Sequence, residues 1–410
     1  MFLYKLIEND ELILALEWAK ENKDKEAINV VLSGLFDFGR TYGFNGNLWK
    51  LYLTYLVCND ENAYSLSCEV KDPGEDSLSE TAKLDFEKLR ELFAEDFSFI
   101  VDAEDKKAYE LTVNFACSNS HLHMLSHRVR DEIAVLCEAI DKAQDSSEIE
   151  KLIRGFYAHF GVGKIGLHRA FRMNDSEIVP ITNVSHVDFD ELVGLDIQKK
   201  TLMDNTEAFL EGKPANNVLL YGDAGTGKST SIKAMMNQYY EQGLRVVEIY
   251  KHQFKNLNDL IAQVKNRRYK FIIFMDDLSF EEQETEYKYL KAVIEGGLEK
   301  KPNNVLIYAT SNRRHLIKET FKDKGAVLDD DIHKNDTVQE KLSLAYRFGV
   351  QIYFPSPEKK EFEKIVLELG NRAGLSLSDQ ELLAKANAWE LRGSGRSGRS
   401  ARQLIDNLSQ

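Results

Sequence analysis

Cysteine and long apolar runs are scarce in this sequence. Its 410 residues include four cysteines, Cys58, Cys68, Cys117 and Cys137, and no two of them form a C-x-x-C pair. This spacing argues against a disulfide framework, and we expect reduced, mostly buried thiols. No apolar run reaches the roughly 18–20 residues that a membrane helix needs, and the first residues lack the basic start of a signal peptide. We therefore expect a cytoplasmic protein without a membrane segment.

Acidic charge is concentrated in the first half of the chain. Residues 1–190 carry 20 basic and 35 acidic side chains, whereas residues 191–410 carry 33 basic and 32 acidic ones. An acidic front half does not favour nucleic-acid binding, because neutralising phosphates requires clustered Lys and Arg. It is more consistent with an unidentified protein partner.

Hydrophobic periodicity divides the chain into four segments. Residues 1–155 show apolar positions three and four apart, which predicts a mainly helical domain. Residues 156–187 contain short runs with β-strand propensity that are interrupted by glycine, which predicts a linker or small hairpin. Residues 188–356 contain five short, continuously apolar runs separated by helical segments, typical of a parallel sheet covered by helices. Residues 357–410 again predict helices, and the fold class is therefore α/β with a helical domain on either side.

A phosphate-binding loop follows the first of the five predicted strands. The segment matches G-x-x-x-x-G-K-[ST] between a strand and a helix, where backbone N–H groups and the helix N-terminus favour phosphate. The residues expected to bind nucleotide here are Gly222, Asp223, Ala224, Gly225, Thr226, Gly227, Lys228, Ser229 and Thr230. Lys228 is expected to contact the β- and γ-phosphates, and Ser229 to bind Mg²⁺. A separate glycine-rich segment, residues 161–166, is interpreted as a turn.

Two aspartates end the strand KFIIFM. Asp276 is expected to hold Mg²⁺ beside the phosphate loop, and Asp277 occupies the next position, where a water-positioning group belongs. The side chain of Asp277 has a shorter reach than a glutamate, so Glu281 or Glu282 could act instead. Tight ATP binding with slow hydrolysis is therefore an open alternative.

Together these motifs resemble those of AAA+ P-loop ATPases over residues 188–410. Asn312 matches the sensor-1 position, and Arg347 lies in an R-F-G segment similar to that of bacterial branch-migration motors, where the arginine reaches a neighbouring subunit. In the last segment, Arg399 best matches the sensor-2 arginine, with Arg402 and Arg396 as alternatives. The segment that contains Val193 and Gly194 resembles the linker that meets the adenine ring.

More narrowly, the segments DDLSFEE, YATSNRRH, R-F-G and the arginine-rich end resemble the bacterial ATPases grouped as domain of unknown function 815. The resemblance implies an ATPase that uses ATP and Mg²⁺, with Lys228, Asp277, Asn312, Arg347 and Arg399 in catalysis. It also implies a homo-oligomeric ring, for which a hexamer is one option. The alternatives are a nucleotide-gated binding module with little hydrolysis and a DNA-associated motor or loader.

Three further signals favour ordinary roles. Cys117, His121, His123 and His127 are close in sequence, but no second ligand group completes a metal site. The acidic tract at residues 328–336 is interpreted as a surface loop. Arg313 and Arg314 are either intersubunit contacts or surface charges.

Overall fold

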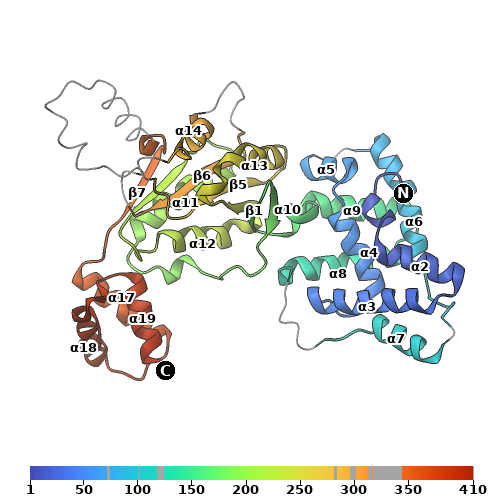
Figure 1. The fold of residues 1–410 in the computed structure, drawn as a ribbon, viewed down its shortest axis with the longest axis horizontal. Helices are drawn as coiled ribbons and strands as arrows, with labels where there is room; N and C mark the ends of the chain where they lie inside the picture. The colour runs from blue at the N-terminus through green and yellow to red at the C-terminus, as the bar shows by residue number, and fades with distance from the viewer. Residues whose placement is uncertain are drawn as a thin grey trace. The chain divides into compact units, whose positions relative to one another are not determined.

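The computed structural model describes residues 1–71, 74–100, 102–117, 124–280, 284–295, 302–312, 316 and 344–409. The chain divides into two compact units (Figure 1). The first comprises Met1–His168 and Pro180–Asn183, and the second comprises Arg169–Val179 and Val184–Gln410. Within the described parts of the chain, no helix has the length and apolar character needed to cross a membrane.

The first unit is built from helices, as its periodicity predicts (Figure 1). Its core gathers large side chains such as Trp49 and Phe86, which are almost fully buried. The helices are α1 (Lys5–Glu8), α2 (Glu11–Asn22), α3 (Lys25–Tyr42), α4 (Leu48–Asn59), α5 (Ala63–Val70), α6 (Ser77–Phe93), α7 (Ala103–Val113), α8 (His127–Lys142), α9 (Ser146–Phe160) and α10 (Gly163–Leu167).

Helix α9 shows why these segments are helical. The Asp145 carboxylate accepts a hydrogen bond from the N–H of Glu148 (2.9 Å), which satisfies a donor that the helix start would otherwise leave unpaired. Its buried apolar residues recur at helical spacing: Ile149, Ile153, Phe156 and Tyr157. The short helix α10 overlaps the glycine-rich segment, residues 161–166, that the sequence predicted only as a turn.

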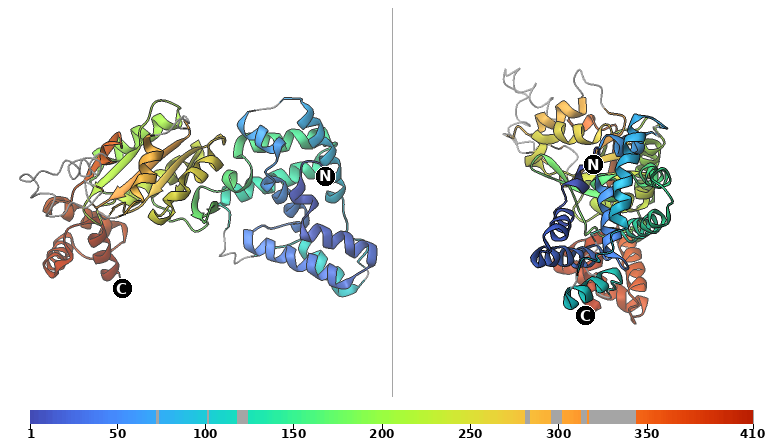
Figure 2. Two further views of the ribbon diagram at one scale, coloured as in Figure 1. Left: turned by 45° about the horizontal axis from the view of Figure 1, so that its top comes forward. Right: turned by 90° about the vertical axis from the view of Figure 1, so that its right-hand side faces the viewer.

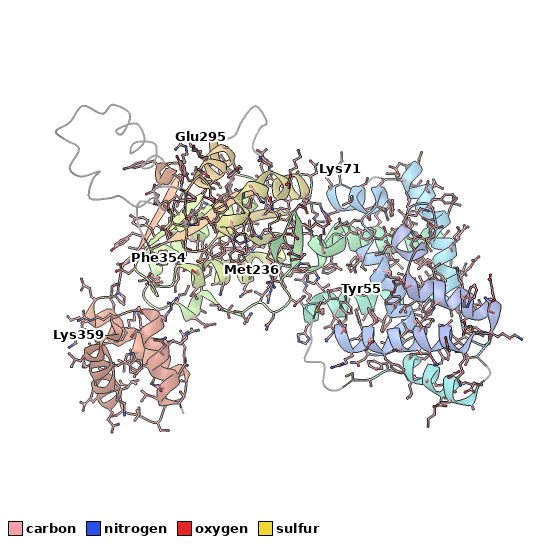
Figure 3. The ribbon with its side chains drawn as sticks, viewed as in Figure 1. Tyr55, Lys71, Met236, Glu295, Phe354 and Lys359 are labelled. Carbon is pink, nitrogen blue, oxygen red and sulfur yellow. The ribbon has the colours of Figure 1, made fainter. Side chains whose placement is uncertain are left out.

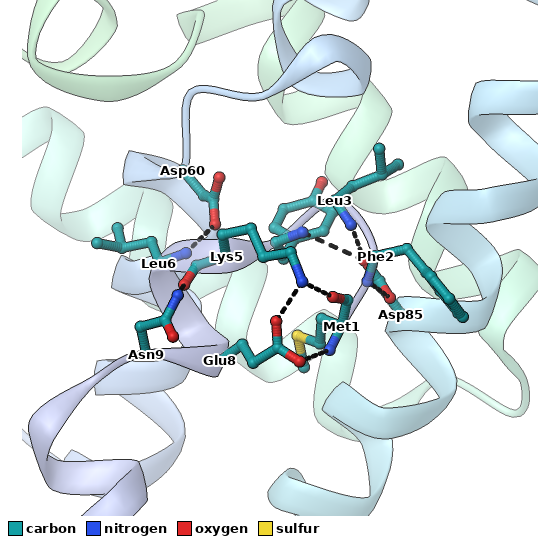
Figure 4. Close-up of polar contacts among 10 residues, drawn as sticks. Met1, Phe2, Leu3, Lys5, Leu6, Glu8, Asn9, Asp60 and Asp85 are labelled. Atoms are coloured by element: carbon teal, nitrogen blue, oxygen red, sulfur yellow. Dashed lines mark hydrogen bonds and ion pairs between the residues drawn. The ribbon is translucent and has the colours of Figure 1, made fainter.

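Buried carboxylates anchor the first residues of the chain to this unit (Figure 4). Asp85 is fully buried, and its carboxylate accepts hydrogen bonds from the N–H groups of residues 2–4 at 2.7, 2.7 and 3.2 Å. Asp60 accepts from the N–H of Leu6 at 2.9 Å. Backbone donors that no helix pairs are thereby satisfied inside the unit, where leaving them unpaired would be costly.

The second unit is an α/β domain with a seven-stranded sheet in the order β2-β1-β4-β5-β6-β3-β7. All five predicted strands are present: β3 (Val218–Gly222), β4 (Leu244–Glu248), β5 (Lys270–Met275), β6 (Val305–Ser311) and β7 (Val350–Phe354). Two further strands, β1 (Ala170–Asn174) and β2 (Glu177–Pro180), come from the predicted linker or hairpin. β1 pairs in parallel with β4, so this segment extends the sheet and is not a free linker.

Helices cover both faces of the sheet (Figures 1 and 2). α12 (Lys228–Tyr239) lies on one side, and α13 (Leu257–Val264) and α14 (Tyr287–Glu295) lie on the other. The chain runs from β3 outward to β4 and then returns through β5 to β6. Right-handed crossovers in opposite directions along a sheet place their helices on opposite faces. Met236 lies on α12 and Phe354 ends β7 (Figure 3).

The last segment forms a small helical lid with its own apolar cluster, which includes Phe362, Val366 and Leu404. Its elements are α17 (Lys359–Arg372), α18 (Asp379–Trp389), the π-helical turn η4 (Glu390–Ser394) and α19 (Gly398–Leu408). The remaining elements of the second unit are α11 (Asp196–Leu210) and the 3₁₀ turns η1 (Phe189–Glu191), η2 (Tyr240–Gln242) and η3 (Lys251–Asn256).

Candidate nucleotide site

The predicted phosphate loop connects β3 to α12. Gly222 has φ +140°, and a Cβ there would lie 2.0 Å from the carbonyl oxygen of Phe354 on the neighbouring strand β7. Gly225 has φ +77°, and a Cβ there would meet Arg399 and Ser397 at 3.0 Å. Only glycine accommodates both the backbone conformation and the close approach at these two positions.

The side chain of Lys228 is held inside this loop. Its Nζ donates to the carbonyl oxygens of Gly222 (2.7 Å) and Asp223 (2.6 Å) and to Oδ1 of Asn312 (3.1 Å). Burial lowers the pKa of Lys228 from its ordinary value, although the nearby carboxylates of Asp223 and Asp277 oppose this shift. A partly desolvated ammonium that already faces inward is well placed to meet phosphate oxygens.

Asp276 meets the start of α12 at the carboxyl end of the sheet. β5 and β6 pair in parallel with Met275 opposite Ala309, so Asp276 and Thr310 follow at the same level. The hydroxyl of Ser229 donates to Oδ1 of Asp276 (2.6 Å), and the hydroxyl of Thr310 donates to the same oxygen (2.5 Å). The structure therefore brings together the two residues predicted to bind the metal.

Asp277 adopts a left-handed backbone conformation with φ +52°, which is unusual for a residue other than glycine. Its N–H donates to Oγ1 of Thr310 (2.9 Å), and its Oδ1 accepts from Nδ2 of Asn312 (2.7 Å). Because Asn312 also accepts from Lys228, its amide connects the lysine of the phosphate loop to the second aspartate.

A cavity of about 760 Å³ lies beside this cluster. It is lined by Val193 and Gly194 from the segment before α11, by residues 224–230, and by lid residues that include Ile365 and Leu369. Asp276, Asp277, Thr310 and Asn312 also line it. Gly222 and Asp223 are not among its lining residues; they shape the loop from behind, where the Asp223 carboxylate accepts from the hydroxyl of Ser356 (2.6 Å).

The lid contacts the phosphate loop directly. The N–H of Arg399, in the first turn of α19, donates to the carbonyl oxygen of Gly225 (3.2 Å). Of the three candidate lid arginines, Arg399 and Arg402 line the cavity, and Arg402 forms an ion pair with Glu191 (3.1 Å). Arg396 instead pairs with Glu390 inside the lid (2.8 Å).

Arg347 lies away from the cavity. It precedes β7, and its guanidinium forms an ion pair with Glu295 at the end of α14, where Nε donates to Oε1 at 2.7 Å. Arg347 is not among the described residues that line the cavity of its own chain.

The donor set beside the loop suits Mg²⁺. A carboxylate and a hydroxyl oxygen converge at Asp276 and Ser229, and Mg²⁺ is usually bound by one or two carboxylates together with water and substrate phosphates. Among the residues that the structure describes, no group of three or more His, Cys, Asp or Glu could hold a metal ion. This site would therefore bind Mg²⁺ together with a phosphate ligand.

Several residues that the sequence singled out lie outside the described residues. They are Glu281, Glu282, Arg313, Arg314, His121, His123 and residues 328–336. Cys117 and His127 are described.

Sequence reasoning missed Thr310, Ser397 and Glu191 as members of the site. For Thr310 a signal was available, because it is the next-to-last residue of a predicted strand and precedes Asn312 by two positions. Side chains at the carboxyl ends of adjacent parallel strands meet at one edge of the sheet. Ser397 and Glu191 have no comparable signal, since only tertiary packing places Ser397 beside Gly225 of the phosphate loop and Glu191, in η1, at the cavity wall.

A comparison of the sequence with protein-family models assigns the chain to a family. The family model described as "Protein of unknown function (DUF815)" matches residues 167–410, more than half of the chain. A curated relative, the replication factor C large subunit of Staphylothermus marinus, is 33% identical over 85 residues, which are 20% of this chain and 19% of that protein. The chain thus spans about a fifth of the length of the curated relative that it matches.

Solved structures with a similar fold include the Thermotoga maritima RuvB Holliday junction branch migration motor, with 17% identity and a TM-score of 0.36 over 54% of this chain and 63% of that one. The FIGL-1 AAA domain in complex with ADP matches with 17% identity and a TM-score of 0.38, over 55% of this chain and 74% of that one.

Proposed function

Since this chain belongs to the DUF815 family and has the α/β fold of an AAA+ P-loop protein, we propose that it binds ATP with Mg²⁺ and hydrolyses it to move its lid. One observation carries the proposal: the phosphate loop, both strand-end aspartates and Asn312 converge on one cavity that the lid also lines. Triphosphate recognition requires this combination of a backbone cradle, a lysine and a metal-binding carboxylate.

Within this proposal, the loop and Lys228 bind the β- and γ-phosphates. Lys228 would exchange its carbonyl partners, Gly222 and Asp223, for phosphate oxygens. Such charge-assisted hydrogen bonds are stronger than those between neutral groups. The residues around Val193 and Gly194, with apolar lid residues such as Ile365, would enclose the base.

Ser229 and Asp276 would hold Mg²⁺, which when bound neutralises charge on the phosphates. Asp277 would orient the attacking water, and Asn312 would sense the γ-phosphate through its hydrogen bonds to Lys228 and Asp277. Arg399 would transmit the state of the phosphates to the lid, because its N–H is bonded to the phosphate loop. Loss of γ-phosphate contacts can thereby shift the lid relative to the core.

The proposal includes an oligomer, because Arg347 would act on the nucleotide of a neighbouring chain. Arg347 would leave Glu295 and stabilise charge on the phosphoryl group in a neighbouring chain, a contribution worth about 10³–10⁵ in rate in related chemistry. A closed ring, of which a hexamer is one form, repeats such a contact around its circumference. The acidic first unit would select the macromolecular partner.

A second candidate function is a nucleotide-gated binding module with little hydrolysis. It is favoured by Asp277, which is shorter than a glutamate and whose carboxylate is engaged by Asn312. In this alternative, ATP binding alone would set the lid position.

ATP turnover measured against protein concentration tests the proposal. We expect specific activity to rise with concentration, and Arg347→Ala mixed with Lys228→Ala to regain part of the activity that each has lost. In the mixture, an intact phosphate loop on one chain faces an intact arginine on the other. Arg372→Ala is the matched control, because Arg372 is also an arginine with a carboxylate partner, Glu368, but lies on a lid helix. Tight ATP binding with flat, negligible turnover would instead support the gated module.

A further inference from the structure

We propose that Thr310 is a positioning residue that holds the metal-side carboxylate and the water-side aspartate in one fixed arrangement. The inference rests on the proposed function and adds a residue to its machinery. Thr310 is buried, with 1% of its surface exposed, although it lies near the end of β6 and lines the cavity. A buried threonine usually satisfies its hydroxyl locally on its own backbone, and here the hydroxyl bonds across to another strand.

The hydrogen-bond directions at Thr310 follow from its chemistry. A hydroxyl has one proton to donate and two lone pairs to accept. The backbone N–H of Asp277 can only donate, so Oγ1 accepts from it at 2.9 Å. The proton of the hydroxyl is then directed to Oδ1 of Asp276 at 2.5 Å. One side chain therefore links both aspartates.

Thr310 also supports the strained backbone that carries Asp277. The carbonyl oxygen of Thr310 accepts from the N–H of Leu278 at 2.7 Å, so three hydrogen bonds tie Thr310 to residues 276–278. Asp277 lies between the flanking bonds with φ +52°. A conformation of this kind persists only where its surroundings hold it. The hydroxyl of Thr310 supplies the part of that support that a side-chain substitution can remove.

The shared oxygen of Asp276 explains why this matters for the metal. Ser229 donates to the same Oδ1 (2.6 Å), and the lone pairs of its oxygen remain available to Mg²⁺. Thr310 holds the same carboxylate from the neighbouring strand. Groups that orient a metal-binding residue from behind typically contribute about 10–100-fold to metal affinity or activity.

The test compares nucleotide affinity with and without metal. A fluorescent, non-hydrolysable ATP analogue is titrated into the full chain in Mg²⁺ and in EDTA, and the ratio of the two affinities measures the contribution of the metal. We expect Thr310→Val to reduce this ratio by about 10-fold while leaving the affinity in EDTA unchanged. Thr310→Ser, which keeps the hydroxyl, should restore the ratio.

The control is Thr206→Val in α11. Thr206 is equally buried and bonds to Leu202 and Tyr308, but it does not line the cavity. A drop in the ratio for Thr310→Val alone supports the inference. An equal drop in the control, or no drop in Thr310→Val with nucleotide still bound, overturns it. If Thr310→Val does not fold, Thr310→Ala replaces it with the same expected result.

Two further readouts separate this inference from the proposed function. Wild-type protein that binds no nucleotide in either buffer would overturn the proposed function, and the inference with it. In turnover assays with Mg²⁺, Thr310→Val should lower kcat/KM for ATP by at least about 10-fold, because its metal-dependent nucleotide affinity is lower, and Thr310→Ser should restore it. An unchanged kcat/KM in Thr310→Val would contradict a positioning role.

Discussion

Glu150 in the helical unit and Asp276 in the α/β unit are both carboxylates that accept hydroxyl hydrogen bonds. Glu150 is 1% exposed and accepts from Tyr64 at 2.6 Å and from Ser79 at 3.1 Å, with Arg154 nearby at 3.4 Å. Asp276 is likewise bonded to two hydroxyls, but it lines a cavity. The same chemistry therefore serves packing in one unit and leaves a carboxylate open to a ligand in the other.

The surroundings of the two carboxylates distinguish one that supports packing from one that faces a cavity. The partners of Glu150 come from helices whose positions the surrounding core already determines. The partners of Asp276 come from the phosphate loop helix and a strand end, and Lys228 and Asn312 continue the network along the cavity wall. We therefore expect substitutions in the first unit to change stability, and those in the second to change ligand binding.

The largest expected effect is Trp49→Ala in the first unit. Trp49 is 2% exposed, and its Nε1 donates to the carbonyl oxygen of Leu92 at 2.8 Å. Truncating a buried aromatic residue typically costs about 3–5 kcal/mol, so chemical denaturation should show this loss in the free energy of unfolding of this unit. Trp18→Ala is the control, since Trp18 is exposed and should matter little. If Trp49→Ala also lost nucleotide affinity, the expectation that substitutions in the first unit change only stability would be wrong.

Lys228→Ala should have the next largest effect. Removing this side chain, which donates to both the loop carbonyls and Asn312, should weaken ATP binding on the order of 100-fold, because hydrogen bonds to charged groups contribute about 1.5–3 kcal/mol each. Isothermal titration calorimetry would measure it. Lys233→Ala, an exposed lysine on the same helix, should bind like wild type. Unchanged affinity in Lys228→Ala would exclude this site.

Asp85→Ala is expected to act only on the first unit. It would leave three backbone N–H donors of residues 2–4 without their acceptor, at a cost of about 1–3 kcal/mol. Thermal unfolding should show a lowered transition for the first unit, with ATP affinity retained. Asp37→Ala, at an exposed position of α3, is the matched control. A change in ATP affinity in Asp85→Ala would contradict the expectation that this substitution affects only the stability of the first unit.

The smallest expected effect concerns the thiols. Cys58, Cys68 and Cys137 are buried, and only Cys117 is partly exposed. Burial raises the pKa of Cys137 from 9.0 to about 11, so at pH 8 its thiol stays protonated in the folded unit. A thiol-reactive chromogenic disulfide should therefore modify one cysteine per native chain quickly and all four in denaturant.

The same shift determines a pH dependence. The unfolded chain releases the Cys137 proton near pH 9, whereas the folded unit retains it until about pH 11. The stability contribution of this group is therefore present below pH 9 and is lost as pH rises toward 11.

The labelling experiment has a contrary outcome. If the chromogenic disulfide modifies three thiols of the native chain at pH 8, the core of the first unit is more open than the structure shows.

Much of the fold could be predicted because its signals are local. The five central strands are continuous apolar runs, and the phosphate loop matches its motif between a strand and a helix. The segment of β1 and β2 was predicted as a linker or small hairpin, but its membership in the sheet could not be predicted, because β1 pairs with β4, about 70 residues later. Short, weakly apolar segments have no intrinsic partner, so only tertiary packing assigns them one.

The candidate site divides in the same way. Lys228, Ser229 and Asp276 could be predicted from the sequence alone, since their chemistry is encoded in local motifs whose spacing the strand–loop–helix geometry requires. Three contacts are visible only in the folded chain: Thr310 links the two aspartates, Arg399 and not Arg396 reaches the phosphate loop, and Arg347 pairs with Glu295. These contacts join segments far apart in the chain, and their geometry arises from sheet register and lid docking, which no local pattern records.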